Sequence, residues 1–161
     1  MANTFKRMEK KTTLPTERVE ELKARIAPYM NDDPFNIDGK PYMICNLYYD
    51  DFDDHVIRGS VQLPKYKEKL RLRSYGVPTP ETKVFLEIKK KYYGVGTKRR
   101  TKLRLCDVES YLETGIHPQG LSYIDDQVLR EIDYYRSHET VVPRVYVSYL
   151  RWAYHAKDDP S

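Results

Sequence analysis

The residues best suited to chemistry in this sequence are cations that alternate with other residues along one stretch, Lys65 to Arg104. This stretch carries fourteen Lys or Arg and three acidic residues, so its local charge is +11 in a chain of net charge +4. Successive side chains of an extended strand point to opposite faces, so each of three segments places its cations on one face. These cations are Lys67, Lys69, Arg71 and Arg73, then Lys83, Lys89 and Lys91, then Lys98, Arg100, Lys102 and Arg104. We expect the three cationic faces to meet around an anion.

These cationic strand faces cannot be buried in a water-free core, because like charges repel strongly in a medium of low dielectric constant. They must hold water and anions, and a condensed phosphate (triphosphate, nucleotide or polyphosphate) fits best. Two carboxylates, Glu9 and Glu87, lie among the cations. They either hold lysines in place or coordinate a metal ion.

Length and composition limit the classes of protein to which this chain can belong. The chain of 161 residues is about one domain, and 32% charged with 12% aromatic residues is typical of globular proteins. Cys45 and Cys106 lack metal-type spacing and suggest reduced thiols in a cytoplasmic protein. No apolar run approaches the roughly 18 residues of a membrane helix, and Met1–Lys11 lacks the apolar core of a signal peptide.

The cationic strands are expected to belong to a larger antiparallel sheet with helices inserted between strands. Short turns at 75–80 and 92–96 predict that the three basic strands form a meander. Further strands are expected at 4–12, 42–50 and 144–154, and helices from Thr16 to about Tyr29, at 55–58, at 107–113 and after Ser122. Asp107 and Ser122 are the expected N-caps, with Asp125 as the capping-box partner of Ser122. A loop is expected at 31–41.

Two features of these elements have alternative interpretations. The acidic run from Asp50 to Asp54 resembles a calcium loop but lacks its glycine and distal glutamate, so a helix-opening turn is favoured. Arg151 continues the apolar face of the last strand, and it either lies at the exposed strand end or completes a basic interior. The elements together predict an α+β fold built on a closed or nearly closed antiparallel β-barrel with a charged cavity.

Five motifs in this order resemble the VTC domain of polyphosphate polymerases, a branch of the triphosphate tunnel metalloenzymes. They are Arg7-x-Glu9-x-Lys11, Lys69-Leu70-Arg71-Leu72-Arg73, Phe85-Leu86-Glu87-Ile88-Lys89-Lys90-Lys91, Lys98-Arg99-Arg100 and Ser148-Tyr149-x-Arg151-x-x-Tyr154. The strand end at 46–50 is also similar. The thiamine triphosphatases and class IV adenylate cyclases of the related CYTH branch open with Glu-x-Glu-x-Lys, whereas this chain has Arg7 at the first position, which favours the VTC branch.

The resemblance implies a tunnel-like β-barrel in which ATP supplies its γ-phosphate to a growing polyphosphate chain, with Mn²⁺ or Mg²⁺ as cofactor. It assigns the catalytic cations to Lys11, Arg71, Arg73, Lys89 and Arg151. Further phosphate-binding cations would be Lys69, Lys91, Lys98 and Arg100, and the metal ligands would be Glu9 and Glu87. Arginine suits bidentate phosphate contact, and such cations stabilise the charge spread over a transferring phosphoryl group.

The family continues beyond the Ser-Tyr-x-Arg-x-x-Tyr strand with further barrel strands, a metal-binding glutamate and a nearby lysine. The present chain resembles the first two-thirds of such a domain, so the resemblance implies an incomplete or open barrel. Self-association with another copy would then supply the missing strands.

Two other functions remain open from the sequence. A hydrolase of the same fold would let water attack triphosphate or a nucleoside triphosphate. A non-enzymatic barrel would bind nucleic acid through basic strands and exposed tyrosines. The tyrosines cluster outside the basic strands, which argues against specific nucleic-acid binding. Under the phosphate-binding interpretation, replacing Arg71 or Arg73 by alanine is expected to abolish triphosphate binding without loss of stability.

Overall fold

The computed structural model describes residues 10–34, 36–62 and 64–158. The chain divides into two compact units, which are considered one at a time: residues 40–151, and residues 1–39 together with 152–161. Most of the expected strand at 4–12 lies outside the described residues, and so does Glu9.

The larger unit is organised around a five-stranded antiparallel sheet in the order β5-β4-β3-β2-β6. Its strands are β2 (Tyr42–Asp50), β3 (Tyr66–Tyr75), β4 (Lys83–Tyr92), β5 (Val95–Arg104) and β6 (Val142–Arg151). The three basic strands pair in sequence order as the short turns predicted. The β4–β5 turn places Tyr93 and Gly94 at positive φ of 44° and 87°, the geometry that matches the twist of a two-residue hairpin.

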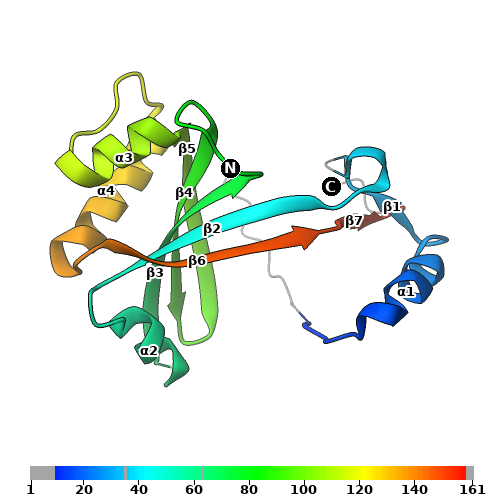
Figure 1. Ribbon diagram of the computed structural model, residues 1–161. Coiled ribbons are helices and arrows are strands. Elements are labelled where there is room, and N and C mark those ends of the chain that lie inside the picture. Colours follow the sequence, from blue (N-terminus) through cyan, green and yellow to red (C-terminus); the bar gives the residue numbers. More distant parts are fainter. Residues whose placement is uncertain (1–9, 35, 63, 159–161) are drawn as a thin grey trace. The chain divides into compact units, whose positions relative to one another are not determined.

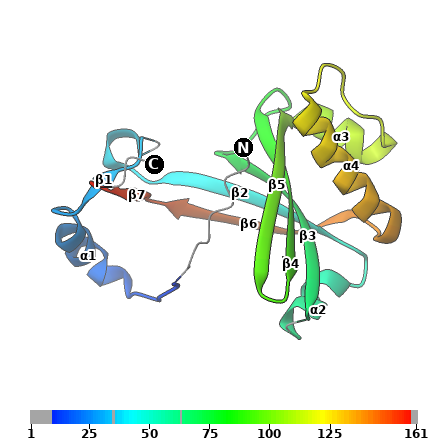
Figure 2. The ribbon, with the colours of Figure 1, turned by 180° about the vertical axis from the view of Figure 1, so that it is seen from behind.

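Helices cover one face of this sheet (Figures 1 and 2). The strands turn every second side chain toward α3 (Leu105–Thr114) and α4 (Tyr123–His138), and the helices contribute the residues that close the core. The buried core residues are Tyr49, Leu70, Leu72, Val84, Leu86, Ile88 and Leu103 from the sheet, and Val108, Tyr111, Val128, Leu129, Ile132 and Tyr135 from the helices. The cations of β3 and β4 alternate with these residues and therefore occupy the opposite face, except for Lys90, which lies on the helix side 3.8 Å from Glu131 of α4.

The α+β class and the antiparallel sheet are confirmed, but the described residues form no closed barrel. The large sheet is open, with β5 at one edge and β6 at the other. The last expected strand is also interrupted, because β6 ends at Arg151 and a separate short strand begins at Tyr154.

Side-chain oxygen acceptors set the starts of two helices, α2 and α4. Asp50 ends β2 and accepts the backbone N–H groups of Val56 and Ile57, each at 2.9 Å, which opens α2 (His55–Val61). The acidic run is thus the helix-opening turn that was favoured over a calcium loop. Ser122 caps α4 by accepting the Asp125 N–H at 3.1 Å, as predicted.

The N-cap predicted at Asp107 is wrong, because β5 runs directly into α3 and Arg104 is the N-cap residue. Asp107 instead accepts two hydrogen bonds from the Arg104 guanidinium, at 2.7 and 2.8 Å. Among the residues that the structure describes, none of the helices combines the length and apolar composition that a membrane crossing requires.

The smaller unit contains η1 (Thr16–Arg18), α1 (Val19–Ile26), β1 (Met30–Asp32), η2 (Ile37–Gly39) and β7 (Tyr154–Ala156). The first helix is thus where the sequence predicted it, whereas the region expected to be a loop, 31–41, contributes to β1. This strand pairs antiparallel with β7. The buried Asn36 side chain ties the two segments together, donating to the Ala153 carbonyl at 2.6 Å and accepting from the Ala153 N–H at 3.1 Å.

Candidate functional site

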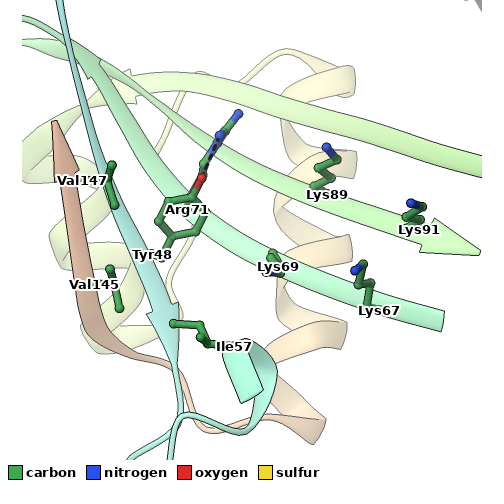
Figure 3. Close-up of a pocket in the computed structure, with 9 residues that line it drawn as sticks. All are labelled: Tyr48, Ile57, Lys67, Lys69, Arg71, Lys89, Lys91, Val145 and Val147. Carbon is green, nitrogen blue, oxygen red and sulfur yellow. Dashed lines mark hydrogen bonds between the residues drawn. The ribbon is translucent and has the colours of Figure 1, made fainter. Parts of the chain in front are cut away.

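A cavity of about 470 Å³ lies on the sheet face opposite α3 and α4 (Figure 3). One wall is cationic and comes from β3 and β4, and the other is mostly apolar and comes from β2, β6 and α2. The lining residues are Lys67, Lys69, Arg71, Lys89 and Lys91 on the cationic wall, and Tyr48, Ile57, Val145 and Val147 on the other. Cations from two separate strands therefore share one cavity.

The register of β3 and β4 sets like charges side by side. Lys69 pairs directly with Lys89, and Lys67 with Lys91. In the described part of the chain none of these four lysines forms an ion pair with a carboxylate. Like charges directly opposite each other destabilise a sheet, so this wall is a strong attractor for anions.

Arg71 is held differently, because Glu87 faces it across the β3–β4 pair. The Arg71 Nε lies 2.6 Å and its Nη2 2.5 Å from Glu87 Oε2, and its Nη1 donates to the Tyr48 hydroxyl at 3.2 Å. The Glu87 side chain is 1% exposed and that of Arg71 18%. This geometry fixes the guanidinium at the edge of the cavity.

The pKa values of three cations reflect this arrangement. Burial, reinforced by the neighbouring charge of Lys67, lowers the pKa of Lys69 although Tyr48 and Asp50 act in the opposite direction. Burial likewise lowers the pKa of Lys98, where Glu87 opposes the shift. For Arg71 burial also acts to lower the pKa, but the charge of Glu87 and the hydrogen bond to Tyr48 outweigh it and raise the pKa.

The other predicted site residues lie outside the cavity lining. Arg73 and Arg151 are on the same sheet face by register, Arg73 donating to the Asn46 side-chain oxygen at 2.9 Å and Arg151 pairing with Tyr42 at the end of β6. Lys98 and Arg100 on β5 each lie 4.0 Å from Glu87 Oε1. Lys11 is exposed and belongs to the smaller unit, so its assignment to the phosphate site stays a prediction.

The apolar wall was not predicted as part of the site. Tyr48, Val145 and Val147 reach the cavity only because β2 pairs with both β3 and β6, which places Tyr48 opposite both Arg71 and Val145. The period-two alternation of β2 and β6 was visible in the sequence, but it does not reveal which face of each strand joins the cations. Lys67 was recognisable from its spacing with Lys69.

A metal ion fits this site only in combination with phosphate. No group of three His, Cys, Asp or Glu side chains among the described residues is arranged to hold one. Glu87 Oε1 is buried and, within the same described set, accepts no hydrogen bond. Lys98 and Arg100 beside it would repel a bare cation. Mg²⁺ is often bound by one or two carboxylates together with substrate phosphates, and Glu87 is the carboxylate that holds Arg71 at the cavity edge, although it is 1% exposed and does not itself line the cavity.

Comparison with protein families assigns residues 6–161 to the model described as the VTC domain. A comparison with curated proteins finds no match. The matched region contains the complete sheet, both walls of the cavity and the Arg71–Glu87 pair. This chain therefore belongs to the VTC domain family, which is associated with polyphosphate polymerases.

Proposed function

We propose that the cavity on the cationic face binds condensed phosphates, and that the chain acts as a polyphosphate polymerase domain. The observation that carries this proposal is the set of four lysines, Lys67, Lys69, Lys89 and Lys91, which line one cavity without a carboxylate partner in the described chain. A polyanion neutralises several of these charges at once, which a single small anion does not. A focused positive field also raises the local concentration of such a ligand.

In the proposed reaction, ATP transfers its γ-phosphoryl group to the end of a polyphosphate chain. The terminal phosphate of that chain is the nucleophile, so no protein nucleophile is needed. Lys69 and Lys89 would neutralise phosphate oxygens, and Arg71, whose orientation is fixed by Glu87, would stabilise the charge that develops on the transferring group. Preorganised donors of this kind need no reorientation during the reaction.

The proposed cofactor is Mn²⁺ or Mg²⁺, entering with the nucleotide phosphates. Such an ion would supply further neutralisation of phosphate charge. Glu87 Oε1 would be its protein ligand in the larger unit, and Glu9, outside the described residues, remains a sequence-based prediction.

The test is incubation of the protein with ATP and Mn²⁺, followed by separation of the products on a gel. Chains longer than triphosphate support the polymerase. Release of orthophosphate alone would replace it with the hydrolase that the sequence left open. Tight binding of single-stranded RNA that polyphosphate cannot displace would overturn phosphate binding itself.

We also propose that the exposed edge of β6 is the place of self-association. Exposed edges are normally protected by charge. The edge strand β5 carries Lys98, Arg100 and Lys102, whereas β6 exposes Tyr146 and Leu150 between its two arginines, Arg144 and Arg151. Sedimentation of the wild type and of Leu150→Lys checks this proposal: a dimer that the substitution dissociates supports it, and a monomeric wild type contradicts it.

A further inference from the structure

The turn between β4 and β5 exposes a group of aromatic and aliphatic side chains that the phosphate cavity does not use. Tyr92 is 62% exposed, Tyr93 60% and Val95 71%, and Tyr66 of β3, which pairs with Tyr92, is 51% exposed. We call these four residues the hairpin tip. The tip lies at the opposite end of the sheet from the β3–β4 turn (Figure 2).

The rings of the hairpin tip are held by each other. Tyr92 contacts both Tyr66 and Tyr93 edge to face, with ring centroids 6.4 and 4.6 Å apart. The Tyr93 N–H donates to the Lys65 carbonyl at 2.8 Å, and the Lys65 ammonium lies over the Tyr93 ring at 5.6 Å. The tip is therefore an ordered apolar surface and not a set of independently moving side chains.

The surroundings of the hairpin tip are basic. Lys65 precedes β3, and Lys67 and Lys91 lie one register position from Tyr66 and Tyr92, on the opposite face of the same sheet end, where they line the cavity. The nearest acidic side chain on these strands, Glu68, lies 3.0 Å from Lys90 and is largely buried. A partner of this surface must therefore be apolar where it meets the tip and negatively charged around it.

We propose that the hairpin tip docks on an anionic lipid surface. Tyrosine is favoured at the membrane–water interface, where its ring lies among the headgroups and its hydroxyl remains hydrated. Basic residues beside such a contact are attracted by the negative potential of anionic lipids. Val95 is the most exposed of the four residues. A purely polar interface gives this side chain no favourable contact, whereas its burial among acyl chains lowers the free energy by removing apolar surface from water.

Single-stranded nucleic acid is the less favourable partner. Base stacking requires an accessible ring face, whereas the rings of the tip contact one another edge to face and Lys65 lies over one face of Tyr93. The aliphatic side chain of Val95 can neither stack on a base nor form a hydrogen bond with it. The chemistry of the patch thus favours lipid.

The experiment is co-sedimentation with vesicles of phosphatidylserine and, for comparison, of phosphatidylcholine. The wild type is expected to bind the anionic vesicles and to be released as salt concentration rises. The double variant Tyr93→Asn with Val95→Thr keeps every charge, and asparagine tolerates the positive φ at position 93. It should bind phosphatidylserine vesicles about tenfold more weakly, because the apolar contact is lost.

A matched control is Val77→Thr, which changes an equally exposed valine (78%) in the β3–β4 turn at the other end of the sheet. It should leave vesicle binding unchanged. Val95→Trp adds a second tryptophan to the chain, whose only one is Trp152, and its emission should shift to the blue when phosphatidylserine vesicles are added.

Three results would overturn the proposal. Equal binding of the double variant and the wild type would assign vesicle binding to the cationic cavity face alone. Absence of wild-type binding, or RNA binding that the double variant loses, would assign the tip to another partner. Circular dichroism of each variant shows whether the fold is retained, and triphosphate binding, which does not use the tip, should be the same in all of them.

Discussion

Lys69 on β3 lies directly opposite Lys89 on β4, and neither forms an ion pair with a carboxylate in the described chain. A sheet that needed only stability would place a carboxylate at one of these positions, as it does at the neighbouring Arg71–Glu87 pair. The two lysines therefore represent a local cost in stability, and an anion bound between them would offset it.

The first prediction concerns these lysines. Lys69→Met and Lys89→Met retain side-chain length but remove charge, so each should weaken triphosphate binding by about tenfold, corresponding to roughly one charge-assisted contact. The melting temperature should stay the same or rise, because like-charge repulsion is relieved. Isothermal titration calorimetry and thermal unfolding measure the two effects.

Lys83→Met is the matched control, because Lys83 lies on the same face of β4 but does not line the cavity. It should alter neither triphosphate binding nor stability. Unchanged binding by both Lys69→Met and Lys89→Met would remove the cavity from the phosphate site.

The second prediction revises the expectation for Arg71. From the sequence, loss of Arg71 was expected to leave stability intact, but in the structure its removal would leave the Glu87 carboxylate buried without its hydrogen-bonded partner. Arg71→Met should lower the free energy of unfolding by about 3–5 kcal/mol, as for other buried ion pairs that lose one member. The double variant Arg71→Met with Glu87→Met should recover part of this loss.

Urea denaturation of the four proteins in this double-mutant cycle measures the coupling. Arg73→Met serves as the control, since Arg73 binds the neutral side chain of Asn46 and leaves no buried charge when removed. If the effects of the Arg71 and Glu87 substitutions simply add, the pair does not act as a unit.

The alternation of charged and apolar residues was enough to predict β3, β4, β5 and their common cationic face. Period-two alternation and short turns are local properties, and the antiparallel pairing of neighbouring strands follows from the short connections. The Arg71–Glu87 pair lies within this locally determined region, yet Glu87 was assigned only a general role beside lysines. The partner of Glu87 depends on which residue of β3 lies directly opposite it. The sequence did not specify the β3–β4 register at the level of single residues.

Non-local pairing accounts for most of what the sequence did not predict. Strand β6 pairs with β2 across about a hundred residues, as Cys45 opposite Ser148 illustrates, and no local pattern specifies that contact. The apolar wall of the cavity and the open sheet both depend on it. At Asp107 the sequence pattern was misleading for a different reason, because the carboxylate binds the side chain of Arg104 and does not cap the helix.

The third prediction concerns pH. The lowered pKa of Lys69 means that, between this value and its ordinary value near 10.4, the unfolded chain binds more protons than the folded one. The free energy of unfolding contributed by Lys69 should therefore rise with pH across this window. Triphosphate affinity should fall over the same window, because the anion requires the charged amine.

Unfolding and binding thus respond to alkaline pH in opposite directions, which separates a titrating lysine from a general loss of structure. Denaturant titrations and calorimetry at several pH values measure the two slopes, and in Lys69→Met both contributions should disappear. A wild-type affinity that stays constant until ordinary lysines deprotonate would contradict the prediction.

The fourth prediction concerns the connection between α3 and α4, which His117 fastens to α4. Its two ring nitrogens lie 2.8 Å from Asp126 Oδ1 and 2.7 Å from Asp133 Oδ2, and Asp133 also accepts the Tyr111 hydroxyl at 2.7 Å. Burial acts to lower the pKa of His117, but the two carboxylates outweigh it and raise the pKa. Only the protonated imidazolium can donate to both carboxylates at once.

Because the pKa of His117 is raised in the folded state, its contribution to stability should be complete below the unfolded value near 6.5 and lost as pH rises through the folded value. Denaturant unfolding from pH 5 to 9 should show this decline in the wild type. His117→Gln has no titrating ring and should remove that part of the pH dependence, whereas His138→Gln, at the exposed end of α4, should retain it. A decline as large in His117→Gln as in the wild type would assign the titration to another group, such as His55, whose pKa is raised by its hydrogen bond to Asp51. The loop would then be held independently of the His117 charge.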